Sequence, residues 1–336
     1  MSTSAAEWRD RRYWPWVLLG LFWLMIQAMT WASYFSQPIV SITDYQTPDL
    51  LSARLAPWFE VVYGLFAVVT VLVVGREVVK RREWTSDAMW VTAFACLIWC
   101  DQMINYFRPG FYFSANFTNV ASWVTHIPGQ IAPHADRVPA PYIWIIGVYI
   151  GGFLPMVRLV VKAVARTEAR WPRRPFWLPP LVALLVINLI TLAIELPLLR
   201  AGLFAYPAAH HDWSIWGGQR WQYPLIEVVA TSVFLYAMYA AMRAEARHGQ
   251  LPSETGIERI VSVWRRKLTQ QLARIGFVVT LFVIFPLGIT QIGPWTTDPF
   301  PTGYAPDLHV DWCGDDGQPY GPCPAPGVPW AVRPAP

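Results

Sequence analysis

Seven apolar stretches, each long enough to cross a lipid bilayer as a helix, run through the 336-residue chain. A spanning helix needs roughly 20 consecutive apolar residues, and its backbone polar groups must all be paired within the hydrocarbon. The composition agrees, because only 14% of the residues are charged, against about 25% in a soluble domain. The pattern predicts an all-α integral membrane protein with about seven transmembrane helices. The expected spans cover residues 14–35, 58–79, 88–107, 141–164, 177–199, 223–242 and 270–292.

Lys and Arg are distributed unevenly between the two sides that these spans define. Of the 26 basic residues, 20 fall in the segments on one side, and cytoplasmic loops carry such an excess. We therefore expect a multi-pass protein of the cell membrane with a cytoplasmic N-terminal segment (1–13), a transmembrane domain (14–292) and an extracytoplasmic tail (293–336). The net charge of +4 is small and spread over several loops, which excludes a nucleic-acid-binding surface.

The segment after residue 292 differs from the spans in composition. It holds five aspartates, and ten of the 30 prolines lie from residue 299 onward. It has no apolar periodicity, so we do not expect it to form a core of its own. Cys313 and Cys323 both lie in this tail. A compartment outside the cytoplasm permits them to form a disulfide, and two free thiols are the alternative.

Four carboxylic acids interrupt the apolar spans near their expected outer ends: Glu60, Asp101, Glu195 and Glu227. A charged side chain at the centre of a bilayer costs about 2.5 kcal/mol or more, so each acid needs a physical reason. A residue near the end of a span can simply reach water among the headgroups, and this explanation fits Glu60 best. The coincidence of Asp101, Glu195 and Glu227 at one depth on three helices favours a shared polar pocket. These three are the expected catalytic residues.

Amide and aromatic side chains lie close to these acids in the sequence and in the long outer loops. Asn105 follows Asp101 by four residues, which would place both on one face of an α-helix. Amides would orient substrate oxygens and rings would form a wall, whereas simple anchoring at the membrane interface is the alternative for the loop aromatics. The expected substrate-binding residues are Asn105, Asn116, Trp123, Tyr206, Trp216 and Tyr223.

Neither a metal nor another cofactor is expected. No pair of histidines has the helical spacing of metal ligands, and adjacent histidines such as His210 and His211 rarely bind one ion together. The chain also contains no glycine-rich phosphate loop and no repeated aspartate motif of the kind that holds magnesium for diphosphate chemistry.

Several short motifs occur in an order that resembles a known family. They are DQMIN at 101–105, Asn116, Ser122 with Trp123, IPG at 127–129, Glu195, GLFAY at 202–206, Trp216, YPLIE at 223–227, GIER at 256–259 and the tail from Cys313 to CPAPGVP at 323–329. Over roughly residues 13–330 the chain resembles the AveC-like spirocyclase family of actinobacterial membrane proteins. The resemblance implies a bacterial plasma-membrane protein that forms spiroketals from a lipophilic, polyketide-like substrate.

Spiroketal formation, as the resemblance implies it, closes a dihydroxy-ketone to a hemiketal, loses water through an oxocarbenium ion and captures that ion with the second hydroxyl. Glycosidases handle a similar cation with one carboxylic acid and one carboxylate. We expect Glu195, near the C-terminus of its helix, to be the acid, because the helix dipole and burial favour its protonated form there. Glu227, near a helix N-terminus, is expected to stay ionised as cation stabiliser and base. Asp101 fits either role.

Two other functions are compatible with the same residues. A membrane cyclase or isomerase of terpenoids or prenyl lipids would use the same acids and rings, and only the substrate class would distinguish it. A non-enzymatic lipid-binding or transport component is the second alternative. A transporter would more often show internal repeats and helices broken at mid-membrane, and the sequence shows no repeat.

Overall fold

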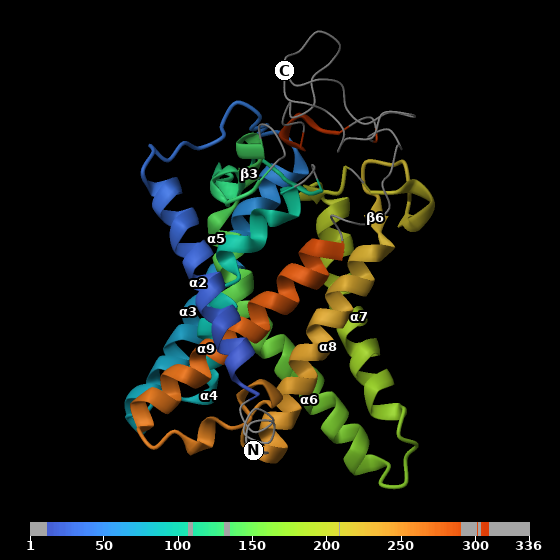
Figure 1. The fold of residues 1–336 in the computed structure, drawn as a ribbon. Coiled ribbons are helices and arrows are strands. Elements are labelled where there is room, and N and C mark those ends of the chain that lie inside the picture. The colour runs from blue at the N-terminus through green and yellow to red at the C-terminus, as the bar shows by residue number, and fades with distance from the viewer. Residues whose placement is uncertain are drawn as a thin grey trace.

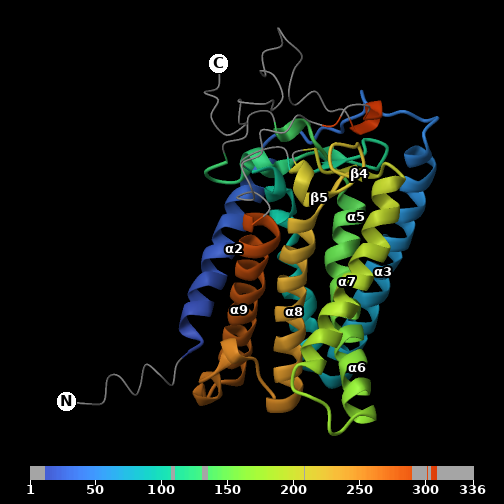
Figure 2. The same ribbon diagram turned by 90° about the vertical axis from the view of Figure 1, so that its right-hand side faces the viewer.

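The computed structural model describes residues 12–106, 110–130, 135–207, 209–289, 301 and 304–308. The described part is a bundle of long helices, with short strands and irregular loops gathered at one end (Figures 1 and 2). Six of its helical segments are long and apolar enough to cross a membrane. They are α2 (Trp14–Phe35), α3 (Leu51–Arg81), the run Tyr142–Arg170, α7 (Leu178–Arg200), α8 (Leu225–His248) and the run Val263–Leu287.

Two of these six segments change helix type along their length. The run Tyr142–Arg170 begins as α5 (Tyr142–Ile146), continues as the π-helix η4 (Gly147–Gly152) and ends as α6 (Phe153–Arg170). The last segment is α9 (Val263–Phe282), followed by the π-helix η8 (Val283–Ile289). Short π segments inside α-helices frequently lie at functional sites.

The third expected span is not one long helix. It consists of α4 (Ser86–Ala95) and the 3₁₀-helix η1 (Ile98–Asn105). Ser86 donates to Glu245 in the last turns of α8, whereas Asn105 lies against the loops at the opposite end. At the usual rises of the two helix types they extend about 31 Å together, close to the thickness of the hydrocarbon. The segment therefore passes from end to end as two short helices, and the expected count of seven long spans is not confirmed.

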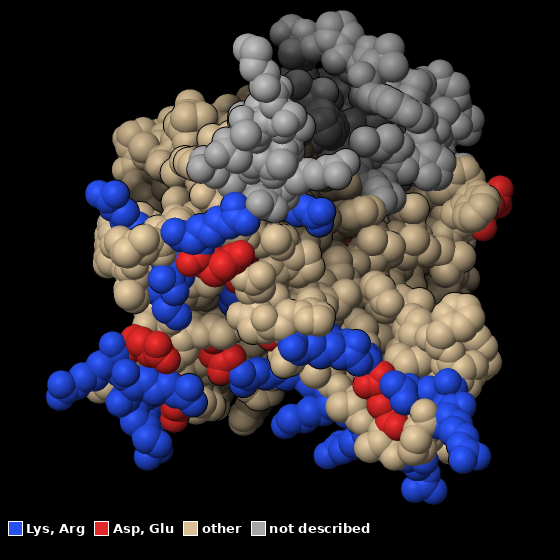
Figure 3. Space-filling view, turned by 60° about the horizontal axis from the view of Figure 1, so that its bottom comes forward, with Lys and Arg blue, Asp and Glu red and all other residues tan. Residues whose placement is uncertain are grey.

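Apolar side chains cover the outside of the bundle. Leu72 on α3 is 65% exposed and Leu189 on α7 is 71% exposed, and long apolar faces of this kind are unfavourable in water. A bilayer would accommodate them, and together with the six long apolar segments they indicate a helical membrane protein. Lys and Arg gather at one end of the bundle (Figure 3), and this is the end that the charge distribution predicts to be cytoplasmic.

Glycines allow the closest contacts between helices. A Cβ added at Gly20 would lie 2.1 Å from the carbonyl oxygen of Leu272, and one at Gly276 would lie 1.9 Å from that of Trp16. The backbones of α2 and α9 therefore touch. A Cβ at Gly151 would likewise lie 2.5 Å from the backbone of α3. Small residues permit this close approach, which supplies packing energy between membrane helices.

Three two-stranded antiparallel ladders tie together the loops at the end opposite the basic residues. They bring segments that are far apart in the sequence side by side above the bundle. β1 (Tyr112–Phe113) pairs with β4 (Phe204–Ala205), β2 (Val120–Ala121) with β3 (Pro139–Ala140), and β5 (Ser214–Ile215) with β6 (Tyr223–Pro224). Short 3₁₀-helices complete these loops: η2 (Trp123–His126), η3 (Ala135–Arg137), η5 (His211–Trp213) and η9 (Pro306–Leu308). Two further 3₁₀-helices, η6 (Pro252–Glu254) and η7 (Ile257–Arg259), connect α8 to α9 at the basic end.

One short part of the tail packs onto these loops. Asp307 in η9 is fully buried. Its Oδ2 accepts hydrogen bonds from Ser52 Oγ at 2.7 Å, Ser114 Oγ at 2.5 Å and Asn116 Nδ2 at 3.0 Å. This segment is therefore stabilised by the body of the protein. Cys313 and Cys323 lie outside the described residues, so their pairing stays a prediction.

Candidate active site

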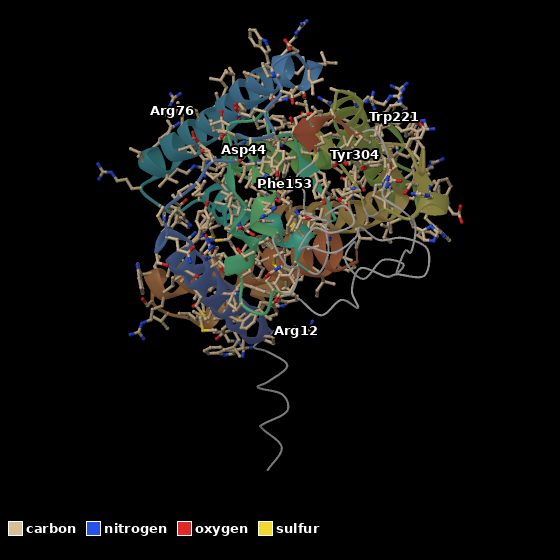
Figure 4. The ribbon with its side chains drawn as sticks, turned by 90° about the horizontal axis from the view of Figure 1, so that it is seen from above. Arg12, Asp44, Arg76, Phe153, Trp221 and Tyr304 are labelled. Carbon is tan, nitrogen blue, oxygen red and sulfur yellow. The ribbon has the colours of Figure 1, made fainter. Side chains whose placement is uncertain are left out.

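The helices enclose a central cavity of about 330 Å³. Phe153, one of its lining residues, lies near the middle of the bundle seen from above (Figure 4). None of the lining residues is Lys, Arg or His. A largely apolar cavity of this size with a few polar groups is typical of a site for a small lipophilic molecule. The aromatic lining residues are Tyr63, Phe66, Phe111, Phe113, Trp144, Tyr149, Phe153, Phe204, Tyr206, Phe234 and Phe282.

Asp101, Glu195 and Glu227 all line this cavity. They come from η1, α7 and α8, respectively, so three separate segments bring one acid each to the same space. Glu60 does not line the cavity. It is buried beside the loops, where its carboxylate accepts hydrogen bonds from the backbone N–H of Thr118 at 2.6 Å and from its hydroxyl at 3.0 Å.

Glu195 is held by two tyrosine hydroxyls. Its Oε2 accepts a hydrogen bond from Tyr223 at 2.6 Å and a longer one from Tyr206 at 3.5 Å. Tyr206 lines the cavity, whereas Tyr223 is fully buried behind the acid. Glu195 lies in the last two turns of α7, which ends at Arg200. The expected position near a helix C-terminus is therefore observed.

Glu227 has fewer hydrogen-bond donors around it than Glu195. It lies in the first turn of α8, as expected, and it is buried. Its Oε1 accepts a hydrogen bond from Thr231 Oγ1 at 2.8 Å. Its Oε2 is buried and has no hydrogen-bond partner among the described residues. This oxygen is available to a polar group of a bound molecule. Glu195 and Glu227 are also close enough to interact electrostatically.

Asp101 is held from the π-helix η4. Its Oδ1 accepts a hydrogen bond from the Tyr149 hydroxyl at 2.6 Å, and its Oδ2 accepts one from Gln102 Nε2 at 2.9 Å. Gln102 in turn accepts a hydrogen bond from Ser122 Oγ at 3.0 Å. Asp101 thus faces the cavity from a junction of two helices that both depart from α-helical geometry.

Asn105 does not line the cavity, and the expectation that it shares a helix face with Asp101 is wrong. Because η1 is a 3₁₀-helix with three residues per turn, a separation of four residues rotates the side chain by about 120°. Asn105 instead holds the following turn. Its Oδ1 accepts from the backbone N–H groups of Gly110 and Phe111, and its Nδ2 donates to the Phe111 carbonyl.

Asn116 and Trp123 lie outside the cavity as well. Asn116 joins the polar cluster around Asp307, described above, and also accepts from the backbone N–H of Thr47 at 2.8 Å. Trp123 is buried, and its indole N–H donates to the carbonyl of Trp99 at 2.7 Å. Both side chains stabilise the loops that cover the bundle.

Trp216 lies in the outer loop before α8, away from the cavity. Its backbone φ of 55° is in the left-handed region, and its ring centroid is 4.9 Å from the guanidinium carbon of Arg200. This is a cation–π contact between the loop and the end of α7. Of the six expected substrate-binding residues, only Tyr206 lines the cavity, and Tyr223 contacts the lining residue Glu195 by a hydrogen bond.

Several lining residues were not expected from the sequence. The contact between Thr231 and Glu227 was predictable from the sequence, because Thr231 follows Glu227 by four residues on an α-helix. The position of Tyr149 was not predictable, since its contact with Asp101 depends on two separate irregular helices. No group of three or more His, Cys, Asp or Glu side chains could hold a metal ion in the part of the chain that the structure describes.

Residues 80–307 match the sequence model of a known family, described as Spirocyclase AveC-like. This region covers more than half of the chain and contains Asp101, Glu195, Glu227 and Tyr149, together with every other lining residue except Tyr63 and Phe66. No curated protein and no solved structure matches the chain. The match agrees with the resemblance seen in the order of the motifs, and the chain belongs to the AveC-like spirocyclase family.

Proposed function

We propose that the protein is a membrane-embedded cyclase that converts a lipophilic dihydroxy-ketone into a spiroketal with loss of one water molecule. The observation that carries this proposal is the single cavity in which Asp101, Glu195 and Glu227 face aromatic walls. The family suggests a cyclase. The substrate class and the steps below are inferred from the chemistry of the cavity.

The hydrogen bonds favour a division of roles opposite to the one expected from the sequence. A hydrogen bond to a charged group contributes about 1.5–3 kcal/mol, whereas a helix dipole contributes roughly 0.3–1 kcal/mol at an exposed helix end and up to about 2 kcal/mol at a partly buried one. Tyr223 and Tyr206 therefore outweigh the dipole of α7 and favour an ionised Glu195. Repulsion from that carboxylate favours a protonated Glu227, whose Oε2 has no partner among the described residues.

In the proposed reaction one hydroxyl of the substrate first adds to the ketone carbon, and its proton passes to the carbonyl oxygen, which gives the hemiketal. The hemiketal hydroxyl then leaves. Glu227 donates its proton to this hydroxyl, the carbon–oxygen bond breaks, and water and an oxocarbenium ion form. The second hydroxyl of the substrate attacks the cationic carbon, and Glu195 takes its proton. One proton then returns from Glu195 to Glu227, which restores both acids, and no electron is transferred. Asp101, fixed by Tyr149, stabilises the positive charge and orients a substrate oxygen.

The walls contribute by excluding water and by facing the cation with rings. Bulk water would capture an oxocarbenium ion and return the hemiketal, so the apolar lining protects the intermediate. Aromatic faces such as those of Trp144 and Phe153 attract a cation electrostatically. The proposed partners of the protein are accordingly a lipophilic small molecule and the lipid bilayer.

A terpenoid or prenyl-lipid cyclase is the second candidate, and the ring-lined cavity is the observation that favours it. Its carbocation would also be generated by a carboxylic acid and stabilised by aromatic faces. The two reactions differ in mass balance. Protonation of an alkene followed by ring closure and proton loss gives a product with the mass of its precursor, whereas spiroketal formation removes one water.

The proposal is tested by comparative metabolite profiling of a deletion strain complemented with wild type, Glu227→Gln or Glu60→Gln. We expect the deletion strain to lose a product and to accumulate a precursor that is heavier by one water molecule. Wild type and Glu60→Gln, a matched change in a buried acid outside the cavity, should restore the product. Glu227→Gln should not restore it, although the protein is present in the membrane.

Other outcomes point to the other functions. A precursor and product of equal mass would replace the spiroketal reaction with the terpenoid type. An unchanged profile in the deletion strain would contradict the enzymatic proposal and favour a lipid-binding or transport component. Full rescue by Glu227→Gln would contradict the assignment of Glu227 as the acid.

A further inference from the structure

A second cleft lies at the basic end of the bundle, between α6, the connection that follows it and α8. Its volume is about 590 Å³, and it shares no lining residue with the central cavity. Its rim is formed by the same end of the molecule that carries most Lys and Arg side chains (Figure 3). The titratable lining residues are Glu168, Arg174, Tyr236, Tyr239, Arg243, Arg247 and His248.

Three arginines in this cleft share a single carboxylate oxygen. Glu168 Oε1 lies 2.5 Å from Arg174 and 3.7 Å from Arg247, and it also pairs with Arg243. Glu168 is the only acid among the lining residues, so two positive charges remain uncompensated within the lining. Each guanidinium carries five N–H donors, far more than one carboxylate can accept. The Nε of Arg174 is buried and has no hydrogen-bond partner within the described residues.

Tyrosines and prolines form the walls of the cleft. Tyr239 accepts a hydrogen bond from Arg243 at 2.5 Å, and Tyr236 lies on the same face of α8. Proline restricts its own backbone, so the prolines of the connection and of the first turn of α7 form a stiff opposite wall. The lining prolines are Pro172, Pro175, Pro179 and Pro180.

Large aromatic side chains beside the cleft project outward. Phe176 is 91% exposed, and Trp171 and Trp177 are each about half exposed. Exposed aromatic rings of membrane proteins commonly lie at the level of the lipid headgroups. The uncompensated arginines and these rings therefore meet at the depth where lipid phosphates are found.

We propose that this basic cleft binds a phosphate ester, and that the ester is the headgroup of an anionic phospholipid in the predicted cytoplasmic leaflet. Guanidinium groups bind phosphate oxygens bidentately with charge-assisted hydrogen bonds. Basic pockets between membrane helices on the cytoplasmic side accept such headgroups. The acyl chains would extend along Phe176 and Trp177. The site is separate from the proposed cyclase chemistry, so either proposal can fail without the other.

The experiment measures binding of phosphatidylglycerol, phosphatidylcholine and inorganic phosphate to the full-length protein in detergent, by native mass spectrometry and by the thermal unfolding midpoint. Wild type should bind phosphatidylglycerol at least roughly tenfold more tightly than phosphatidylcholine. The double variant Arg174→Gln with Arg247→Gln should lose roughly tenfold or more of this affinity, because charge-assisted bonds are removed. The control, Arg166→Gln with Arg265→Gln, removes two exposed charges at the same end outside the cleft and should bind like wild type.

A Glu168→Gln variant keeps the test decisive if the double arginine variant is unstable. Because it removes the only acid of the lining, it should bind phosphatidylglycerol more tightly than wild type. If the arginine cluster has only a structural role, the Glu168→Gln variant would unfold at a lower temperature and would bind phosphatidylglycerol no more tightly than wild type. This result would overturn the proposal. Equal binding of the two lipids, or equal losses in both double variants, would also overturn it. Stabilisation by inorganic phosphate but not by phosphatidylglycerol would identify a soluble phosphate ester and reject the lipid.

Discussion

The acids at the basic end of the bundle and the acids of the central cavity have different partners. At the basic end, Glu245 and Glu254 are paired with Arg274. In the central cavity, Asp101, Glu195 and Glu227 form no ion pair within the described residues, and their observed partners are hydroxyl and amide groups. An acid locked to an arginine stays ionised and holds helices together. An acid held by hydroxyls can still exchange a proton with a bound molecule. The comparison separates structural acids from acids available for chemistry.

The structural network is centred on a fully enclosed arginine. Arg274 on α9 is 1% exposed in its side chain, and one of its nitrogens lies 2.7 Å from Glu254 and 2.8 Å from Glu245. Its guanidinium also donates to Ser86 and lies 4.8 Å from the ring centroid of Trp90. It therefore connects α9 with α4, α8 and η6.

The largest effect is expected for the loss of the proton donor in the cavity. Glu227→Gln keeps the size of the side chain but cannot donate an acidic proton. Loss of a general acid costs about 100- to 10,000-fold in rate, and we expect turnover of the accumulated precursor by isolated membranes to fall within this range. Turnover close to wild type would place the acid elsewhere. Glu60→Gln, outside the cavity, should retain full activity.

The second-largest effect is expected for the loss of Arg274, which should lower the thermal stability of the protein. Arg274→Met leaves two carboxylates without their counter-charge, and breaking a buried pair in this way costs about 3–5 kcal/mol. We expect a clearly lower thermal unfolding midpoint and a reduced yield of folded protein. Arg265→Met removes an exposed arginine from the start of the same helix and should leave the midpoint within about 1 °C. Equal midpoints for the two variants would show that the network is not structural.

A smaller effect is expected from the tyrosines behind Glu195. Tyr223→Phe removes the hydrogen bond of 2.6 Å, and a bond to a charged group contributes about 1.5–3 kcal/mol. If Glu195 is the ionised base, turnover should fall roughly 10- to 100-fold. Tyr206→Phe removes only the contact of 3.5 Å and should have the weaker effect. A larger effect of Tyr206→Phe would contradict the assignment of Tyr223 as the main partner.

The smallest stability effects come from two neighbouring glycines with different surroundings. Gly152 lines the cavity and a Cβ there would meet nothing within 4 Å, whereas one at Gly151 would strike α3 at 2.5 Å. Gly152→Ala should therefore be neutral or stabilising by about 0.5–1 kcal/mol, and Gly151→Ala should be destabilising. Thermal unfolding distinguishes them. Gly152→Leu should additionally raise the KM for the precursor by filling the cavity, and an unchanged KM would show that the substrate binds elsewhere.

The membrane-spanning helices were predictable because hydropathy is a local property of the chain. The shared location of Asp101, Glu195 and Glu227 also followed from the sequence, since the order of spans sets the depth of each acid. Composition does not show that an apolar stretch will break into α4 and η1. The prediction that Asn105 lies beside Asp101 was wrong for that reason. A 3₁₀-helix rotates Asn105 away from Asp101.

The proposed roles of the acids depend on contacts between distant segments. Tyr223 reaches Glu195 from another loop, and Tyr149 reaches Asp101 from a π-helix. Neither contact has a periodic signal in the sequence. The position of Trp216 was not predictable from the sequence either, because its backbone conformation and its contact with Arg200 are set by the packing of the loop. Sequence patterns located the acids, whereas tertiary contacts supply their hydrogen-bond partners.

The central claim is that the cavity acids are held for chemistry and not for stability. It is tested most directly by thermal unfolding of the double variant Glu195→Gln with Glu227→Gln, compared with wild type and Arg274→Met in the same lipid nanodiscs. Gln keeps the hydrogen-bond acceptor of each side chain and removes the cost of holding a charged carboxylate in a largely apolar cavity, so we predict a midpoint equal to or above that of wild type. A midpoint lowered as far as that of Arg274→Met would contradict the claim.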